Sequence, residues 1–315
     1  MPRRLGLPSV YLAAAMATAA TTAVPLAMTP ASGLALRPAP VEPARPYIVT
    51  ARDRGDARDL VGEVRWRVRR YFTSALPGFA TFLTAAELAE LRADPRVRTI
   101  EPDRRIHPMA STRPERPSTV RADGTGVTVY VVDSGVKAKQ AGFGERAWRA
   151  FDATGGTGRD CGGHGTRVAA RAHDVAPGAR IASVRVLGCD GTGTLADVLA
   201  GLDWIHRHAR GPSVANLSID GAGSPALDAA ARSLVRSGVF VVGAADQGTC
   251  QVTSDGRAFS AHAPYLAGAA ARHLELHPSA GPAALATRLG CTTARGAIRQ
   301  NPSRRSNLLM RDGGL

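Results

Sequence analysis

Two side chains of this sequence lie at positions where enzymes often have acid–base groups. Asp133 comes directly after the apolar run VTVYVV, so its carboxylate lies at the end of a predicted buried strand and can orient an imidazole. His164 follows two glycines in DCGGHGT and precedes a predicted helix, so its ring can project from a tight turn into a crevice. Ser260 lies further along the chain. The order of Asp, then His, then Ser is one of three known chain orders for triads that hydrolyse a substrate through a nucleophilic serine. These three residues are the candidate catalytic group.

Alternating strand and helix patterns from residue 126 onward are expected to hold these side chains in place. Four mostly apolar runs, each bounded by turn residues, are typical of fully buried parallel strands: VTVYVV, IASVRV, VANLSI and VFVVGA. An apolar stripe over residues 195–205 marks one intervening helix. Ser224 and Pro225 begin another, which Gly238 ends. The alternation predicts an α/β domain over residues 126–315, with a parallel sheet and the site at the carboxyl edge of its strands.

A smaller block over residues 47–106 has its own alternating plan. YIVT, FATFL and VRTI are predicted strands, and the helix after the first has one apolar face made of Leu60, Val61, Val64 and Val68. The second helix begins with a capping box of Thr84 and Glu87. Leu83 and Leu88 are placed as its hydrophobic staple. The pattern predicts a β-α-β-β-α-β arrangement, a small α+β domain of the ferredoxin-like type.

The N-terminus has the composition of a secretory signal. Arg3 and Arg4 precede an apolar run, which small residues and Pro25 follow. Residues 1–35 are therefore predicted to be a signal peptide, because the run is shorter than the roughly 20 apolar residues that a membrane anchor needs. A Pro-rich linker over residues 36–46 follows. After signal removal the protein is expected to be secreted and extracellular, without membrane contact.

Composition narrows the classes of partner. The chain carries a net charge of +14, but its positive residues are nearly all Arg spread singly along the sequence, and only 5% of residues are aromatic. Nucleic-acid binders concentrate charge on one face among stacking aromatics, so no nucleic-acid partner is expected. Neither the histidines nor the Gly-rich loops have the spacing of metal ligands or phosphate loops, so no metal and no nucleotide are predicted.

Taken together, the motifs resemble the subtilisin-like serine peptidases, in particular the secreted branch that includes proteinase K. VYVVDSGV is similar to the family's aspartate motif, GHGTRVAA to its histidine motif, and SAHAPYLAGAAA to its serine motif with the buried helix that follows. VRVLGCDGTGTLADVLAGLDWI and ANLSIDGAGSPALDAA resemble its two substrate-lining segments, and residues 47–106 resemble its inhibitory prosegment. The resemblance covers most of the chain and implies a subtilisin-like three-layer fold over residues 126–315.

The resemblance also implies a role for individual residues. Ser260 would attack the scissile carbonyl, His164 would take and return its proton, and Asp133 would hold the imidazole tautomer. Gln247 stands where the family has an oxyanion-binding Asn. Four positions would bind an extended protein or peptide substrate: Gly191, Gly193, Ser218 and Gly221.

A self-processing precursor is a further implication of the resemblance. The prosegment would act as an intramolecular inhibitor, and a cut within a processing linker over residues 107–125 would release a monomeric endopeptidase. Cys161 and Cys189 would form a disulfide, as in some family members, whereas Cys250 and Cys291 either pair or remain free thiols. Calcium often accompanies the family, but no acidic loop for it is identifiable, so no cofactor is assigned.

Some residues depart from the family pattern. Ala-Phe replaces Gly-Thr directly before the serine, and Asp220 replaces a Gly at the substrate edge, where it is expected to narrow the cleft or repel. Only 96 positions separate His164 from Ser260, about 50 fewer than in the subtilisin triad. Ser260 therefore belongs either to the nucleophile motif, as its distance from Pro264 indicates, or to the segment that precedes, in the family, the residues absent from this chain. The alternative function is a pseudopeptidase that binds peptide or prosegment without turnover.

Overall fold

The computed structural model describes residues 42–64, 67–112, 121–139, 142–220, 223–246, 250–295 and 308–312. The predicted signal peptide lies outside these ranges, as do Gly221 and Gln247. The strands are β1 (Arg45–Ala51), β2 (Val68–Phe72), β3 (Gly78–Leu83), β4 (Val97–Pro102), β5 (Arg105–Ile106), β6 (Thr128–Asp133), β7 (Ala147–Asp152), β8 (Arg180–Arg185), β9 (Gly193–Thr194), β10 (Ser213–Leu217), β11 (Phe240–Ala244), β12 (Gln251–Val252), β13 (Ala258–Ser260), β14 (Cys291–Arg295) and β15 (Leu308–Asp312). The helices are α1 (Arg54–Glu63), α2 (Ala85–Ala93), α3 (His164–Val175), α4 (Leu195–His208), α5 (Pro225–Arg236), α6 (Ala263–Leu276) and α7 (Pro282–Arg288), with a short 3₁₀ turn at Gly144–Arg146.

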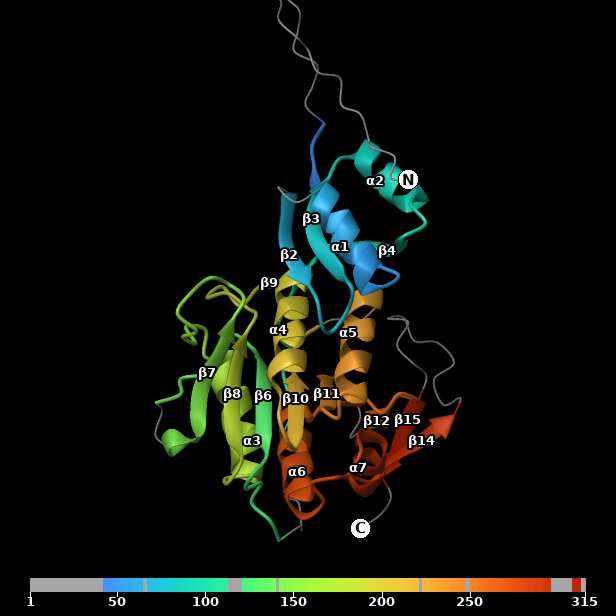
Figure 1. The fold of residues 1–315 in the computed structure, drawn as a ribbon. Coiled ribbons are helices and arrows are strands. Elements are labelled where there is room, and N and C mark those ends of the chain that lie inside the picture. The colour runs from blue at the N-terminus through green and yellow to red at the C-terminus, as the bar shows by residue number, and fades with distance from the viewer. Residues whose placement is uncertain are drawn as a thin grey trace, which may run out of the picture. The chain divides into compact units, whose positions relative to one another are not determined.

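A seven-stranded sheet forms the centre of the larger domain, in the order β12-β13-β11-β10-β6-β8-β7 (Figure 1). The strands from β13 to β7 are parallel, and the edge strand β12 runs antiparallel to β13. Strands β6, β8, β10 and β11 are the four apolar runs of the sequence. The predicted α/β fold with a mostly parallel sheet is confirmed, and the helices α4 and α5 also begin where the sequence placed them.

Successive residues of each central strand face opposite helical layers. Val129 and Val131 of β6 pack in a cluster with residues of α3 and α6, whereas Tyr130 and Val132 pack with residues of α4 and α5. All four are at most 5% exposed. Burial of each such side chain contributes about 1.5 to 3 kcal/mol to the stability of the fold. Because both faces of these strands are buried, they contain few polar residues.

The N-terminal domain, residues 45–102, is an antiparallel sheet in the order β2-β3-β1-β4 with α1 and α2 on one face. Val49, Phe79 and Leu88 pack together in its own core, on the side of the two helices. Ile48 and Phe72 on the other face join the cluster that contains residues of α4 and α5. In Figure 1, β2 lies next to α4 and β4 next to α5. The capping box of Thr84 and Glu87 is present, as predicted.

Several strands were not located from the sequence, and β2, β7 and β13 are three of them. Val68 was expected on the first helix, but α1 ends at Glu63 and Val68 begins β2. In β2, buried or half-buried residues alternate with exposed ones, because successive side chains of a strand point to opposite faces of the sheet. The strand β7 extends the main sheet beyond β8, and β13 places Ser260 at its carboxyl end.

Two disulfides connect loops of the larger domain. One joins Cys161, just before α3, to Cys189, after β8, and the other joins Cys250 to Cys291. The second pairing, which the sequence left open, therefore exists in this structure. Among the described helices, none is both long and apolar enough to span a bilayer.

Candidate active site

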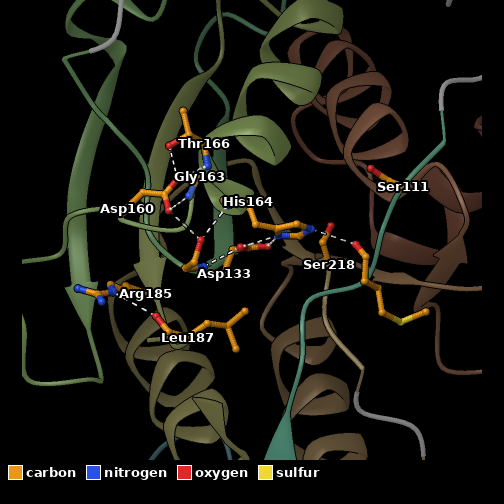
Figure 2. A network of polar contacts seen from close by, with 12 residues as sticks. Ser111, Asp133, Asp160, Gly163, His164, Thr166, Arg185, Leu187 and Ser218 are labelled. Atoms are coloured by element: carbon orange, nitrogen blue, oxygen red, sulfur yellow. Dashed lines mark hydrogen bonds and ion pairs between the residues drawn. The ribbon is translucent and has the colours of Figure 1, made fainter. Parts of the chain in front are cut away.

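Asp133 and His164 meet at the carboxyl edge of the central sheet. Nδ1 of His164 lies 2.8 Å from Oδ1 and 2.9 Å from Oδ2 of Asp133, whose side chain is fully buried (Figure 2). The His164 side chain is 18% exposed, so one side of the ring reaches the surface while the carboxylate stays dry. This is the pairing of an orienting carboxylate with an acid–base imidazole.

The surroundings of His164 favour its charged form. Burial lowers the pKa of His164, but the hydrogen bond to Asp133 and the charge of that carboxylate raise it by more, so the pKa lies above its usual value. The other ring nitrogen, Nε2, lies 3.2 Å from the carbonyl oxygen of Met109. Because each nitrogen faces an acceptor and needs its own N–H, the arrangement fits an imidazolium. The ring must lose one proton before it can act as a base.

Glycines allow the turn that carries His164. Gly163 has a φ of +75°, a left-handed conformation that other residues adopt with strain, and it precedes the first residue of α3. A Cβ at Gly165 would lie 2.2 Å from the carbonyl oxygen of Gly135 and 3.1 Å from Oδ1 of Asp133. The Gly-His-Gly sequence therefore lets the start of α3 approach the end of β6 closely.

Asp160 also stabilises this turn, although no motif in the sequence singles it out. Its carboxylate is 3% exposed and accepts hydrogen bonds from the Ser134 hydroxyl at 2.9 Å and from the Gly163 N–H at 2.7 Å. It also accepts from the N–H and the hydroxyl of Thr166 (Figure 2). The Ser134 oxygen in turn accepts the N–H of Gly165. Asp160 thus ties the end of β6 to the start of α3 and fixes where His164 stands.

We expect Asp160→Ala to lower the free energy of unfolding by about 3 to 5 kcal/mol, because several buried donors lose their shared acceptor. Urea unfolding followed by circular dichroism measures the loss. Asp174→Ala, an exposed position on the same helix, is the control and is expected to change stability by less than about 0.5 kcal/mol. Equal unfolding midpoints for the two variants would contradict this role of Asp160.

An extended segment of the chain lies across the site. This cleft segment, residues 105–112, pairs through Ile106 with Gly193 of β9 on one side. On its other side the N–H of Met109 donates to the carbonyl oxygen of Ser218 at 2.8 Å, and Pro108 bridges to Ile219. The segment is therefore the middle strand between two edges of the cleft, as a bound peptide would be.

The predicted substrate-binding residues divide into three groups. Gly193 and Ser218 contact the cleft segment through their backbones. Gly191 does not pair with it, because its N–H donates to the Gly188 oxygen within a turn. Gly221 lies outside the described residues. In this structure the N–H of Gly191 is used within the turn from Gly188 to Thr192, and a role of Gly191 in substrate binding stays a prediction.

Ser260 lies at the end of β13, next to the end of β11, and is 1% exposed. Its hydroxyl oxygen accepts the N–H of His262 at 2.9 Å. Among the described residues, no hydrogen bond joins Ser260 to His164. The next residue, Ala261, accepts the N–H of Thr112 at 3.0 Å, so the chain at Ser260 borders the cleft segment on the far side of Met109.

An oxyanion donor and a metal ion are the two further groups that could stabilise negative charge in this region. Gln247, the predicted oxyanion donor, lies outside the described residues. No group of three or more His, Cys, Asp or Glu side chains in the described ranges is placed to hold a metal ion, and so no site for calcium is identified there.

Comparison with known families agrees with this geometry. The sequence pattern of the subtilase family matches residues 124–258, and that of the peptidase inhibitor I9 family matches residues 48–109. The first ends two residues before Ser260, and the second ends at Met109, the residue beside His164. The match to the subtilase pattern thus covers Asp133 and His164 but not Ser260.

Curated relatives share the same regions. The chain is 38% identical over 200 residues to an extracellular serine proteinase of Thermus sp. (strain Rt41A), a match that covers 57% of this chain and 49% of that protein. It is 37% identical to alkaline serine exoprotease A of Vibrio alginolyticus, with 55% and 38% covered. The chain therefore spans about half the length, or less, of these relatives.

Solved structures give the same architecture. A cold-adapted subtilisin-like serine proteinase matches with a TM-score of 0.50 and 27% identity, over 65% of this chain and 95% of that one. Fervidolysin from Fervidobacterium pennivorans matches with a TM-score of 0.56 over 76% of this chain and 56% of that one, but at 17% identity it supports the fold alone. With both sequence patterns and the sheet in agreement, the chain belongs to the subtilase family and carries a peptidase inhibitor I9 prosegment.

Proposed function

We propose that this protein is a secreted serine endopeptidase, made as a precursor that cuts its own chain between Met109 and Ala110. The observation that carries the proposal is the position of the Met109 carbonyl oxygen, 3.2 Å from Nε2 of His164, whose other nitrogen is held by Asp133. A peptide bond presented to an oriented imidazole in an extended strand is the substrate arrangement of acyl transfer.

Ser260 is proposed as the nucleophile. Once His164 is neutral, its Nε2 takes the Ser260 hydroxyl proton while Oγ bonds to the Met109 carbonyl carbon. His164 then returns that proton to the nitrogen of Ala110, the C–N bond breaks, and a water molecule releases Met109 from Ser260 as a carboxylate. Asp133 keeps the ring oriented and stabilises its charged form. Support for Ser260 comes from its place in the chain order and from the contact of Ala261 with Thr112 beyond the cut bond.

The N-terminal domain is proposed to act as the enzyme's own inhibitor until it is removed. The carboxylate of Asp103, the residue just after this domain, accepts the N–H of Ala196 at 2.9 Å, at the start of α4. The carboxylate of Glu101 in β4 accepts the N–H of Ala226 at 2.7 Å, at the start of α5. Carboxylates at helix N-termini are favourable because those N–H groups have no partner within the helix. Asp203 of α4 accepts three backbone N–H groups of the loop after β2, from residues 73–75. These contacts hold the cleft segment in place.

Secretion is part of the proposal. Its support is the signal-like composition of residues 1–35, the two disulfides, and the extracellular location stated for the Thermus relative. Disulfides persist in oxidising compartments, which an exported protein reaches.

Intact mass and N-terminal sequencing of the purified full chain test the function. The expected product begins at Ala110, with residues up to Met109 released as a separate fragment that accompanies it. One turnover per molecule is enough for this result, so even a slow enzyme would give it. A protein that stays joined across Met109 and Ala110 after prolonged incubation at alkaline pH would contradict the proposal.

A pseudopeptidase is the second candidate, and one observation favours it. The Ser260 hydroxyl accepts a hydrogen bond from His262, while Nε2 of His164 is turned to the Met109 carbonyl. In an attacking arrangement Ser260 would be the partner of that nitrogen. A chain that binds its prosegment without cutting it would retain this arrangement permanently, and the mass measurement distinguishes the two functions.

A further inference from the structure

Asp220 contacts the cleft segment in a way that the mechanism does not use. Counting back from Met109, whose carbonyl faces His164, His107 stands two residues upstream. The N–H of Asp220 donates to the His107 carbonyl oxygen at 2.9 Å. The N–H of His107 donates in turn to Oδ1 of the Asp220 side chain at 2.6 Å. One residue of the cleft edge therefore satisfies both backbone groups of His107, one of them with a carboxylate.

The second carboxylate oxygen of Asp220 faces the side chain at this position. Oδ2 lies 3.4 Å from Nδ1 of His107. The backbone contact fixes the carboxylate, so it stays beside whichever side chain a bound peptide places there. A fixed negative charge at this distance attracts a cationic side chain and repels an anionic one. The sequence predicted that Asp220 narrows the cleft or repels, and in this structure its carboxylate contacts His107.

We propose that Asp220 makes the mature enzyme prefer substrates with a cationic side chain two residues before the residue whose carbonyl is attacked. The inference rests on the proposed peptidase function. The His107 and Asp220 side chains are 54% and 41% exposed, so solvent weakens the attraction. The expected preference for Lys over Gln is therefore about 2- to 5-fold in kcat/KM, with Glu below Gln, and it decreases as salt is added.

Matched peptides test the preference directly. Three peptides based on residues 105–112 carry Lys, Gln or Glu in place of His107, and their kcat/KM values are compared for the wild-type enzyme, for Asp220→Asn and for Asp190→Asn. Asn at 220 keeps an oxygen for the backbone N–H but has no charge. Asp190→Asn removes an exposed carboxylate from the turn before β9 and serves as the charge-matched control.

The expected result is that kcat/KM decreases from the Lys to the Gln to the Glu peptide in the wild type and in the Asp190 variant, and that these differences disappear in Asp220→Asn. A ranking that survives in Asp220→Asn, or no ranking in the wild type, overturns the inference. Failure to cut even the Gln peptide contradicts the peptidase function instead.

A second measurement needs no turnover. In the full chain with Ser260→Ala, urea midpoints are compared for His107→Lys and His107→Glu, each with Asp220 or with Asp220→Asn. The Lys chain is expected to be the more stable of the two with Asp220, and the difference is expected to vanish with Asn. An unchanged difference overturns the role of Asp220 whether or not the enzyme cuts peptides.

Discussion

A full-length chain carrying Ser260→Ala is expected to keep the Met109–Ala110 bond intact under conditions in which the wild type cuts it. Removing the serine from a subtilisin triad lowers kcat on the order of 10⁶-fold, and the same size of loss is expected here if Ser260 is the nucleophile. A process that takes the wild type minutes would then take years. Because Ser260 is buried at the end of β13 and Ala is smaller, the fold is expected to persist.

Intact mass spectrometry over time measures the result, with circular dichroism to show that the variant is folded. Ser237→Ala, which removes an exposed hydroxyl from the end of α5, is the matched control and is expected to be processed like the wild type. His164→Ala is expected to fail as completely as Ser260→Ala, and the double variant no more completely, because the residues act as a unit. Normal processing of Ser260→Ala would show that another group is the nucleophile.

Asp133→Asn is expected to lower kcat about 10⁴-fold and to move the pH dependence of the remaining activity. The loss follows because an amide no longer holds His164 in the tautomer that presents a free Nε2. The shift follows from charge. Burial lowers the pKa of His164, and it is the hydrogen bond and charge of Asp133 that raise it above its usual value. The Asn variant has no carboxylate, so both contributions of Asp133 that raise the pKa of His164 are lost. Burial still lowers that pKa, which is therefore expected to fall.

The sign of the pH shift is fixed by the role of the ring. His164 accepts a proton only when neutral, so activity rises with pH through its pKa. In the wild type that rise is expected above the usual histidine range, and in Asp133→Asn it is expected at lower pH. The measurement is kcat/KM for one peptide from acid to alkaline pH in both proteins. An acidic limb at the same pH in both would mean that Asp133 does not set the charge of His164.

Much of the fold could be predicted because strongly patterned segments carry their own signal. The four central strands are apolar on both faces, since helices cover both sides, and that makes them stand out in the sequence. The start of α2 was predictable because its capping box is a local interaction between Thr84 and Glu87. Such features depend on residues close together in the chain.

The elements that were missed have no such signal. The strand β2 contains two arginines and is partly exposed, and its first residue, Val68, also fits the apolar face predicted for the preceding helix. The strand β13 has three residues, and it forms because β11 offers an unpaired edge rather than because of its own sequence. Short edge strands depend on their neighbours more than on propensity.

Motifs, periodicity and turn residues are local properties, and they were enough to predict the family, the α/β and α+β domains, and the candidates Asp133 and His164. Which residues contact one another depends on the tertiary structure. It joined Asp133 to His164 across 31 positions, placed Met109 at Nε2 of that ring and Asp220 beside His107, and paired Cys250 with Cys291. It also left Ser260 without a hydrogen bond to His164 among the described residues, which the chain order could not reveal. Those contacts arise where separate strands and loops end at one sheet edge, and no local pattern encodes their distances.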